Sequence, residues 1–128
     1  MTYNDFLVQV IREGIMAAAM QYNQPEQVHK LQGSLEGFES CYEKPPEELG
    51  VELLLANEAA DRFFWNRDDA TDKEENLQQY WRFRCKALEI EYVCNVVSAM
   101  LINEGLPTII QPTSRGVRRA AEIIGVKS

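Results

Sequence analysis

The sequence has few of the residues that hold small domains together covalently or through a metal. It contains three cysteines, an odd number without CxxC spacing, and a single histidine, His29. A disulfide framework or a zinc site is therefore not expected, and the cysteines are typical of reduced thiols inside a cell. No histidine lies beside a thiol or hydroxyl in a pattern that predicts a catalytic residue.

Long hydrophobic runs are also missing. The longest strongly apolar, uncharged stretch covers residues 92–103, well short of the ~20 residues that a helix needs to span a bilayer. The first residues lack the basic start and apolar run of a signal peptide. We therefore expect a cytoplasmic protein without a membrane partner.

Alternating runs of β-branched residues are absent, whereas apolar residues recur at helical spacing along most of the chain. The sequence therefore predicts an all-α fold in a single domain, 1–128: a helical bundle of four main helices plus a short C-terminal helix. The expected elements are main helices at about 3–22, 25–44, 46–66 and 73–104, then an extended linker and the C-terminal helix in 106–128.

The predicted helices differ in how many apolar faces they carry. The second has one narrow stripe, formed by Val28, Leu31, Leu35, Phe38 and Tyr42. The third has two faces, one of Leu49, Leu53, Ala56, Ala60 and Phe63 and an opposite one of Val51, Leu54, Leu55 and Trp65. A helix with two apolar faces requires a covering layer on each side.

The long central helix at 73–104 contains neither glycine nor proline and also has two apolar faces. At 1.5 Å per residue it would be ~48 Å long. Such a helix must kink, be sandwiched or project into a partner subunit. We favour projection, and hence a homo-oligomer; a central helix within a self-contained bundle is the alternative.

Acidic residues are nearly missing from the C-terminal end. Residues 1–114 hold nine Lys and Arg against nineteen Asp and Glu, a net charge of −10, whereas residues 115–128 hold four against one, a net charge of +3. A helix is expected to start here, and its unpaired N–H groups favour an anion over arginines. The sequence therefore predicts a site for an anionic, phosphate-bearing ligand. Its expected residues are Thr113, Ser114, Arg115, Gly116, Arg118 and Arg119.

Two other interpretations of this segment are available. The arginines could instead pair with acids of the same chain or of a neighbouring subunit. Residues 120–126 resemble the first helix and turn of helix-turn-helix proteins. No recognition helix follows in the sequence, so we do not expect the protein to recognise DNA. The net charge of −7 also disfavours broad contact with nucleic acid and permits a basic partner protein.

Two acidic pairs at helical spacing form a second candidate site. They are Glu36-x-x-Glu39 in the second helix and Glu58-x-x-Asp61 in the third, and two such helices side by side could hold Mg²⁺. Residues 25–65 here resemble the all-α nucleoside triphosphate pyrophosphohydrolases of the MazG and phosphoribosyl-ATP pyrophosphohydrolase families. The resemblance implies that these four carboxylates bind Mg²⁺, which would bridge the triphosphate and help to activate water.

The C-terminal segment, from Asn103 to Val126, resembles the ends of small uncharacterised accessory proteins of tailed phages. We therefore expect a small acidic non-enzymatic interaction protein, homo-oligomeric and of the phage accessory or counter-defence type, in the host cytoplasm. It would need no cofactor and would bind a phosphate-bearing small molecule or a host protein. The alternatives are the Mg²⁺-dependent hydrolase and a structural component of the virion head or neck.

Overall fold

The computed structural model describes residues 3–44, 46–65 and 73–105, and every element within these ranges is helical. The elements are α1 (Tyr3–Gln21), the 3₁₀ turn η1 (Pro25–Gln27), α2 (Val28–Glu43), α3 (Pro46–Trp65) and α4 (Lys73–Asn103). The predicted all-α fold is confirmed. The predicted linker and C-terminal helix, 106–128, lie outside the described residues. None of the helices described is long and apolar enough to cross a membrane.

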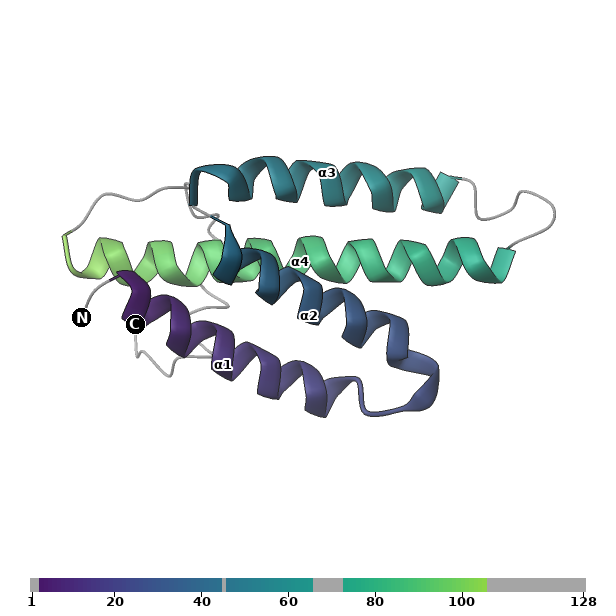
Figure 1. Ribbon diagram of the computed structural model, residues 1–128, viewed down its shortest axis with the longest axis horizontal. Coiled ribbons are helices and arrows are strands. Elements are labelled where there is room, and N and C mark those ends of the chain that lie inside the picture. Colours follow the sequence, from purple (N-terminus) through teal and green to yellow (C-terminus); the bar gives the residue numbers. More distant parts are fainter. Residues whose placement is uncertain (1–2, 45, 66–72, 106–128) are drawn as a thin grey trace.

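α4 is the central helix of the molecule. In Figure 1, α3 lies along one side of α4 and α2 along the other, with α1 beside α2. α2 and α4 run in one direction, and α1 and α3 run in the opposite direction. α2 and α3 each contact α4 extensively and touch each other only slightly. The chain's own helices therefore sandwich α4, as in the alternative of a central helix within a self-contained bundle, and the homo-oligomer stays a prediction.

The core lies where α1, α2 and α4 meet. Ile90 of α4 has no exposed surface, and burying an aliphatic side chain of this kind contributes ~1.5–3 kcal/mol. Leu49 of α3 joins the same apolar cluster, so all four long helices share one core. Its largest fully buried apolar side chains are Val10, Phe38, Cys41, Cys85, Ile90, Val93 and Val96.

α2 lies so close to α4 that two of its positions must be glycine. A Cβ atom added at Gly37 would lie 2.7 Å from the carbonyl oxygen of Lys86, and one added at Gly33 would overlap the carbonyl of Arg82. Real Cβ atoms do not approach backbone atoms this closely. The contact between the two helices is therefore set by their backbones rather than by large side chains.

This packing corrects the predicted orientation of α2. Of the expected apolar stripe, Phe38 is fully buried, but Val28, Leu35 and Tyr42 are exposed. The buried face consists mainly of small residues, namely Gly33, Ser34, Gly37, Ser40 and Cys41. Hydrophobicity therefore identified only part of the buried face, since Leu31 and Phe38 pack in or against the core but the close approach to α4 requires small residues elsewhere.

α4 ends where its sequence predicts. It continues without a break to Asn103, and Gly105 follows with a φ of 72°. The backbone N–H of Gly105 donates to the carbonyl of Ile102 at 3.0 Å, which satisfies one of the last carbonyl groups of the helix. A left-handed residue just beyond a helix is a common terminator, and glycine adopts this conformation without strain.

Candidate protein-binding surfaces

An open apolar groove of about 340 Å³ lies on the outer side of α1. We call it the α1 groove. Ile11 is buried at its base, while Val8 and Ile15 are half-exposed and Met16 is largely exposed. The lining residues are Val8, Ile11, Arg12, Ile15 and Met16 of α1 and Tyr42 of α2.

The α1 groove exists because α1 carries more apolar residues than its core contact uses. The buried face of α1 contains Leu7, Val10, Ile11 and Ala18. Val8 and Ile15 are seven residues apart, about two helical turns, and form a second row beside that face. The sequence analysis identified no surface on this helix and missed the groove, although the second apolar row was its signal.

α2 extends the apolar surface beside the groove. Val28, Leu35 and Tyr42 recur every seven residues, which keeps them on one face of the helix. Tyr42, which lines the groove, has 67% of its surface exposed. The apolar stripe predicted for α2 is thus divided, because Leu31 and Phe38 pack in or against the core while Val28, Leu35 and Tyr42 are exposed.

Two exposed acidic residues of α2 lie near Tyr42 in sequence. Glu39 and Glu43 are exposed on α2, and Glu39 lies one helical turn from Tyr42. Arg12 is the basic residue in the groove lining. Residues 3–44 hold six acidic and three basic side chains, a net charge of −3. The groove is therefore an apolar surface in a negatively charged setting, which favours a positively charged partner.

The outer face of α3 is a second exposed apolar surface. As the sequence predicts, Leu49, Ala56 and Ala60 form a face that is buried against the bundle. The opposite face is exposed, and 78% of the surface of Trp65 is accessible. Its apolar members are Val51, Leu54, Leu55 and Trp65, which we call the α3 outer face.

Contacts between aromatic side chains join the end of α3 to the first half of α4. Phe63 stacks on Phe83 with a centroid distance of 5.8 Å and an interplanar angle of 7°. Phe64 contacts Tyr80 at 5.3 Å, and Tyr80 contacts Trp81 edge-on at 5.0 Å. Aromatic pairs of this kind add ~0.5–1.5 kcal/mol to the free energy that their buried area contributes.

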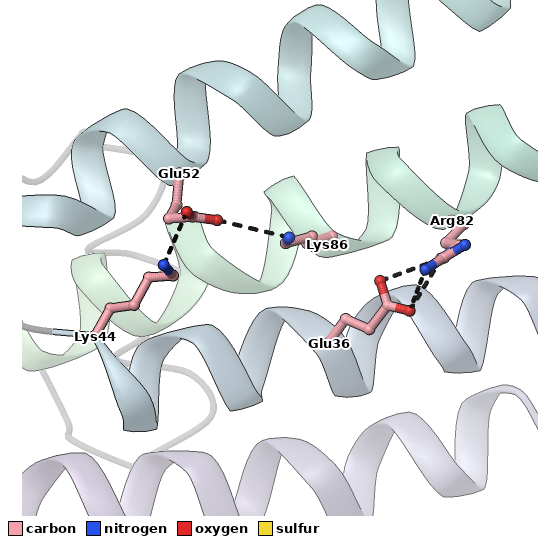
Figure 2. Close-up of polar contacts among 5 residues, drawn as sticks. All are labelled: Glu36, Lys44, Glu52, Arg82 and Lys86. Carbon is pink, nitrogen blue, oxygen red and sulfur yellow. Dashed lines mark hydrogen bonds and ion pairs between the residues drawn. The ribbon is translucent and has the colours of Figure 1, made fainter.

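Glu52 of α3 connects three helices. Figure 2 shows its carboxylate between Lys44, the residue that directly follows α2, and Lys86 of α4. The Nζ atoms of these lysines lie 3.2 Å and 3.6 Å from the carboxylate oxygens. Lys86 and Glu52 are both largely shielded from solvent, which limits the screening of their attraction. The ion pairs hold α3 at a fixed position along α4.

The predicted metal ligand Glu36 is engaged by an arginine. Arg82 Nε donates to both carboxylate oxygens of Glu36, at 2.9 and 3.1 Å, and Nη2 lies 2.7 Å from Oε1 (Figure 2). Such a forked contact is the geometry that an arginine makes with a carboxylate. Glu36 therefore joins α2 to α4 in this structure.

The other three candidate metal ligands are exposed and are divided between two helices. Glu39 is on α2, while Glu58 and Asp61 are on α3, and α4 lies between these two helices. Across the ranges that the structure describes, no three histidine, cysteine, aspartate or glutamate side chains come together as a metal site. The two acidic pairs predicted from the sequence thus do not converge.

The three thiols are packing residues. Cys41 and Cys85 are buried and Cys94 is half-buried. Burial raises the pKa of all three, to about 11 for Cys94. A thiol with a raised pKa is a weak nucleophile at neutral pH because little thiolate is present.

A second hollow, of about 480 Å³, lies between η1 and the first turns of α4. Trp81 lines it, but Lys30 covers the indole ring, with Nζ 4.3 Å from the ring centroid. This cation–π contact uses the ring face that a ligand would need. The α1 groove is therefore the better candidate site.

The predicted anion site at 113–119 lies outside the described residues. In comparisons with known proteins, the chain matches no family model, no curated protein and no solved structure. Its function is therefore inferred from its own surfaces.

Proposed function

We propose that this chain is a small acidic, non-enzymatic interaction protein that binds a partner protein through the α1 groove. The observation that carries the proposal is the exposed apolar lining of the groove, with the ring of Tyr42 at its edge. Contiguous exposed apolar surface rimmed by polar residues marks binding sites on soluble proteins. The bundle beneath α1 is packed and gives the groove a rigid base.

The expected partner element is an amphipathic helix with a basic polar side. An open groove along a helix accepts the apolar face of a second helix, with anchors at i, i+3 or i+4 and i+7. Lysine or arginine on the flank of that helix would approach Glu39 and Glu43, whereas an acidic flank would be repelled. Met16, which lines the groove, can adapt to anchors of different shape.

The test uses two helical peptides with the same apolar face, one with lysines and one with glutamates on the polar side. We expect the basic peptide alone to bind, measured by fluorescence anisotropy. Met16→Glu, which places a charge in the groove, should weaken binding about tenfold or more, the effect of ~1.4 kcal/mol.

Met20→Glu is the matched control, since Met20 is on the same helix, is exposed and does not line the groove. Its binding should equal that of the unchanged protein. Equal binding of the two peptides, or equal weakening by the two substitutions, would contradict the proposal.

Each of the other roles predicted from the sequence can be tested by a separate experiment. A phosphate-bearing ligand at 113–119, in a phage accessory or counter-defence protein, predicts an adduct in native mass spectra that is lost on replacing Arg115 and Arg119 by alanine. The hydrolase alternative predicts Mg²⁺-dependent pyrophosphate release that is lost in Glu58→Gln. A virion component predicts assembly into a large ring.

A further inference from the structure

The α3 outer face is uncovered by the helices that the structure describes. α3 packs on α4 through its other face and touches α2 only slightly. Val51 and Leu54 each have 58% of their surface exposed, and Leu55 has 54%. The helix is ~30 Å long, and its exposed apolar residues extend from the second turn to its last residue, Trp65.

α3 presents this face on a rigid support. Glu52 binds Lys44 and Lys86 near one end, and Phe63 stacks on Phe83 near the other. Between these points, Arg84 donates a hydrogen bond from Nη1 to Asn57 Oδ1 at 3.1 Å. A helix held at three points along its length can bind a partner without a large ordering cost.

We propose that the α3 outer face binds the same face of a second copy of this chain, with the two α3 helices antiparallel about a two-fold axis at Leu55. Two exposed charges on α3 support this arrangement. Glu48 is in the first turn and Arg62 is in the last turn, and Leu55 is midway between them in sequence. With the axis at Leu55, Glu48 of each copy lies opposite Arg62 of the other.

The direction of the pairing also follows from these positions. Glu48 and Arg62 are fourteen residues apart, which places them on the same flank of the helix. A helix has a left and a right side along its contact with a partner helix. When two helices pair antiparallel, equivalent sides of the two helices face each other; when they pair parallel, opposite sides do. Only the antiparallel arrangement thus forms two Glu48–Arg62 pairs.

We expect the molecule that binds the α3 outer face to be a second copy of this chain, since an interface with two-fold symmetry must be complementary to itself. The α3 outer face satisfies this condition, with Leu54 and Leu55 at the centre and opposite charges at equal distances on either side. A contact of one helix pair is smaller than the ~800 Å² per partner of a standard interface, so we expect a weak, reversible dimer.

This pairing uses α3, which lies on the other side of α4 from α1 and α2 (Figure 1). The residues that line the α1 groove belong to α1 and α2. It does not depend on the proposed function, and a dimer would present two grooves. Bivalent partners would then bind more tightly than a single groove allows.

The experiment is sedimentation velocity of the full chain over a concentration series in the micromolar range. We expect the weight-average mass to rise towards that of a dimer with concentration. Leu55→Asp should abolish the rise. Ile102→Asp is the control, since Ile102 of α4 is also 54% exposed, and it should dimerise as the unchanged chain does.

Charge exchange tests the antiparallel geometry and does not rely on altering an apolar residue. Glu48→Arg should weaken dimerisation about tenfold or more, and adding Arg62→Glu in the same chain should restore it. A constant monomer mass, dimerisation of Leu55→Asp, loss of the dimer in Ile102→Asp or failure of the double substitution to restore it would overturn the proposal. Peptide binding at the α1 groove is measured separately, so either idea can fail alone.

Discussion

α2 and α3 both pack along α4, but they do so through different chemistry. α2 meets α4 through small residues, and its glycines bring the two backbones close enough that a single methyl group would overlap a carbonyl. α3 buries Leu49, Ala56 and Ala60 against the bundle, and aromatic rings and charged side chains add contacts to α4. The first contact brings backbone atoms together and leaves no room for a methyl group, whereas the aromatic and charged contacts of α3 are made by side chains.

The difference between the two contacts indicates where this protein tolerates amino-acid substitutions. Side chains can move to new rotamers when a neighbour is altered, whereas a close backbone contact has no such freedom. We therefore expect substitutions in the α2 contact to destabilise the whole bundle. Substitutions in the α3 contact should loosen α3 and leave the rest of the core, where α1, α2 and α4 meet, in place.

The largest expected effect is that of Gly33→Ala. The added Cβ would overlap the carbonyl of Arg82, so α2 would have to move away from α4. We expect a loss of about 3 kcal/mol or more in the free energy of unfolding, measured by urea denaturation.

Gly50→Ala is the matched control on α3. A Cβ atom at Gly50 meets nothing within 4 Å, and alanine favours a helix over glycine. This variant should gain about 0.5–1 kcal/mol. If Gly33→Ala were as stable as the unchanged chain, the contrast between the two contacts would be broken.

A smaller effect is expected from removing the aromatic stack of α3. Phe83→Ala should cost about 2 kcal/mol, less than a fully buried phenylalanine, because the ring is only partly buried. In a double-mutant cycle with Phe63→Ala, the coupling between the two rings should be about 1 kcal/mol. Additive losses would show that the rings pack independently.

Alkaline pH should lower the free energy of unfolding, because it ionises the thiols. Burial raises the pKa of Cys94 to about 11, above the ~8.5 of a thiol in an unfolded chain. The neutral thiol therefore stabilises the fold fully below that unfolded value, and this contribution is lost as the pH rises towards about 11. Between pH ~9 and ~10 the loss should be on the order of 1 kcal/mol per thiol of this kind.

Cys94→Ala should have a flatter dependence of unfolding free energy on pH in this range. The buried Cys41 and Cys85, whose pKa values burial also raises, would supply the remaining slope. Identical pH profiles for the variant and the unchanged chain would show that Cys94 is not shielded from water.

The sequence predicted the helices of this fold well. Helical spacing of apolar residues indicated four main helices, and proline and glycine placed their ends, as Gly105 does for α4. These signals are local, since a helix and its terminators are defined within a few neighbouring residues. The fold class followed from them.

The sequence was a poorer guide to which face of each helix is buried. It favoured Val28 and Tyr42 over Gly33 because a periodicity argument ranks positions by hydrophobicity, while the α2 contact requires small size. The acidic pair of Glu36 and Glu39 likewise says nothing about which helix it will face. In the structure Glu36 meets Arg82 of α4, a contact between residues far apart in the chain.

The smallest expected effect tests the charged part of the α3 contact. Glu52→Gln keeps the shape of the side chain but removes the charge that attracts Lys44 and Lys86. Half-buried pairs of this kind contribute more than exposed ones, whose median is ~0–1 kcal/mol, and we expect a loss of about 1 kcal/mol. Glu48→Gln, at an exposed position of the same helix, should leave the unfolding free energy of the monomer unchanged. A loss of several kcal/mol in Glu52→Gln would mean that α3 depends on a charge network as strictly as α2 depends on its glycines.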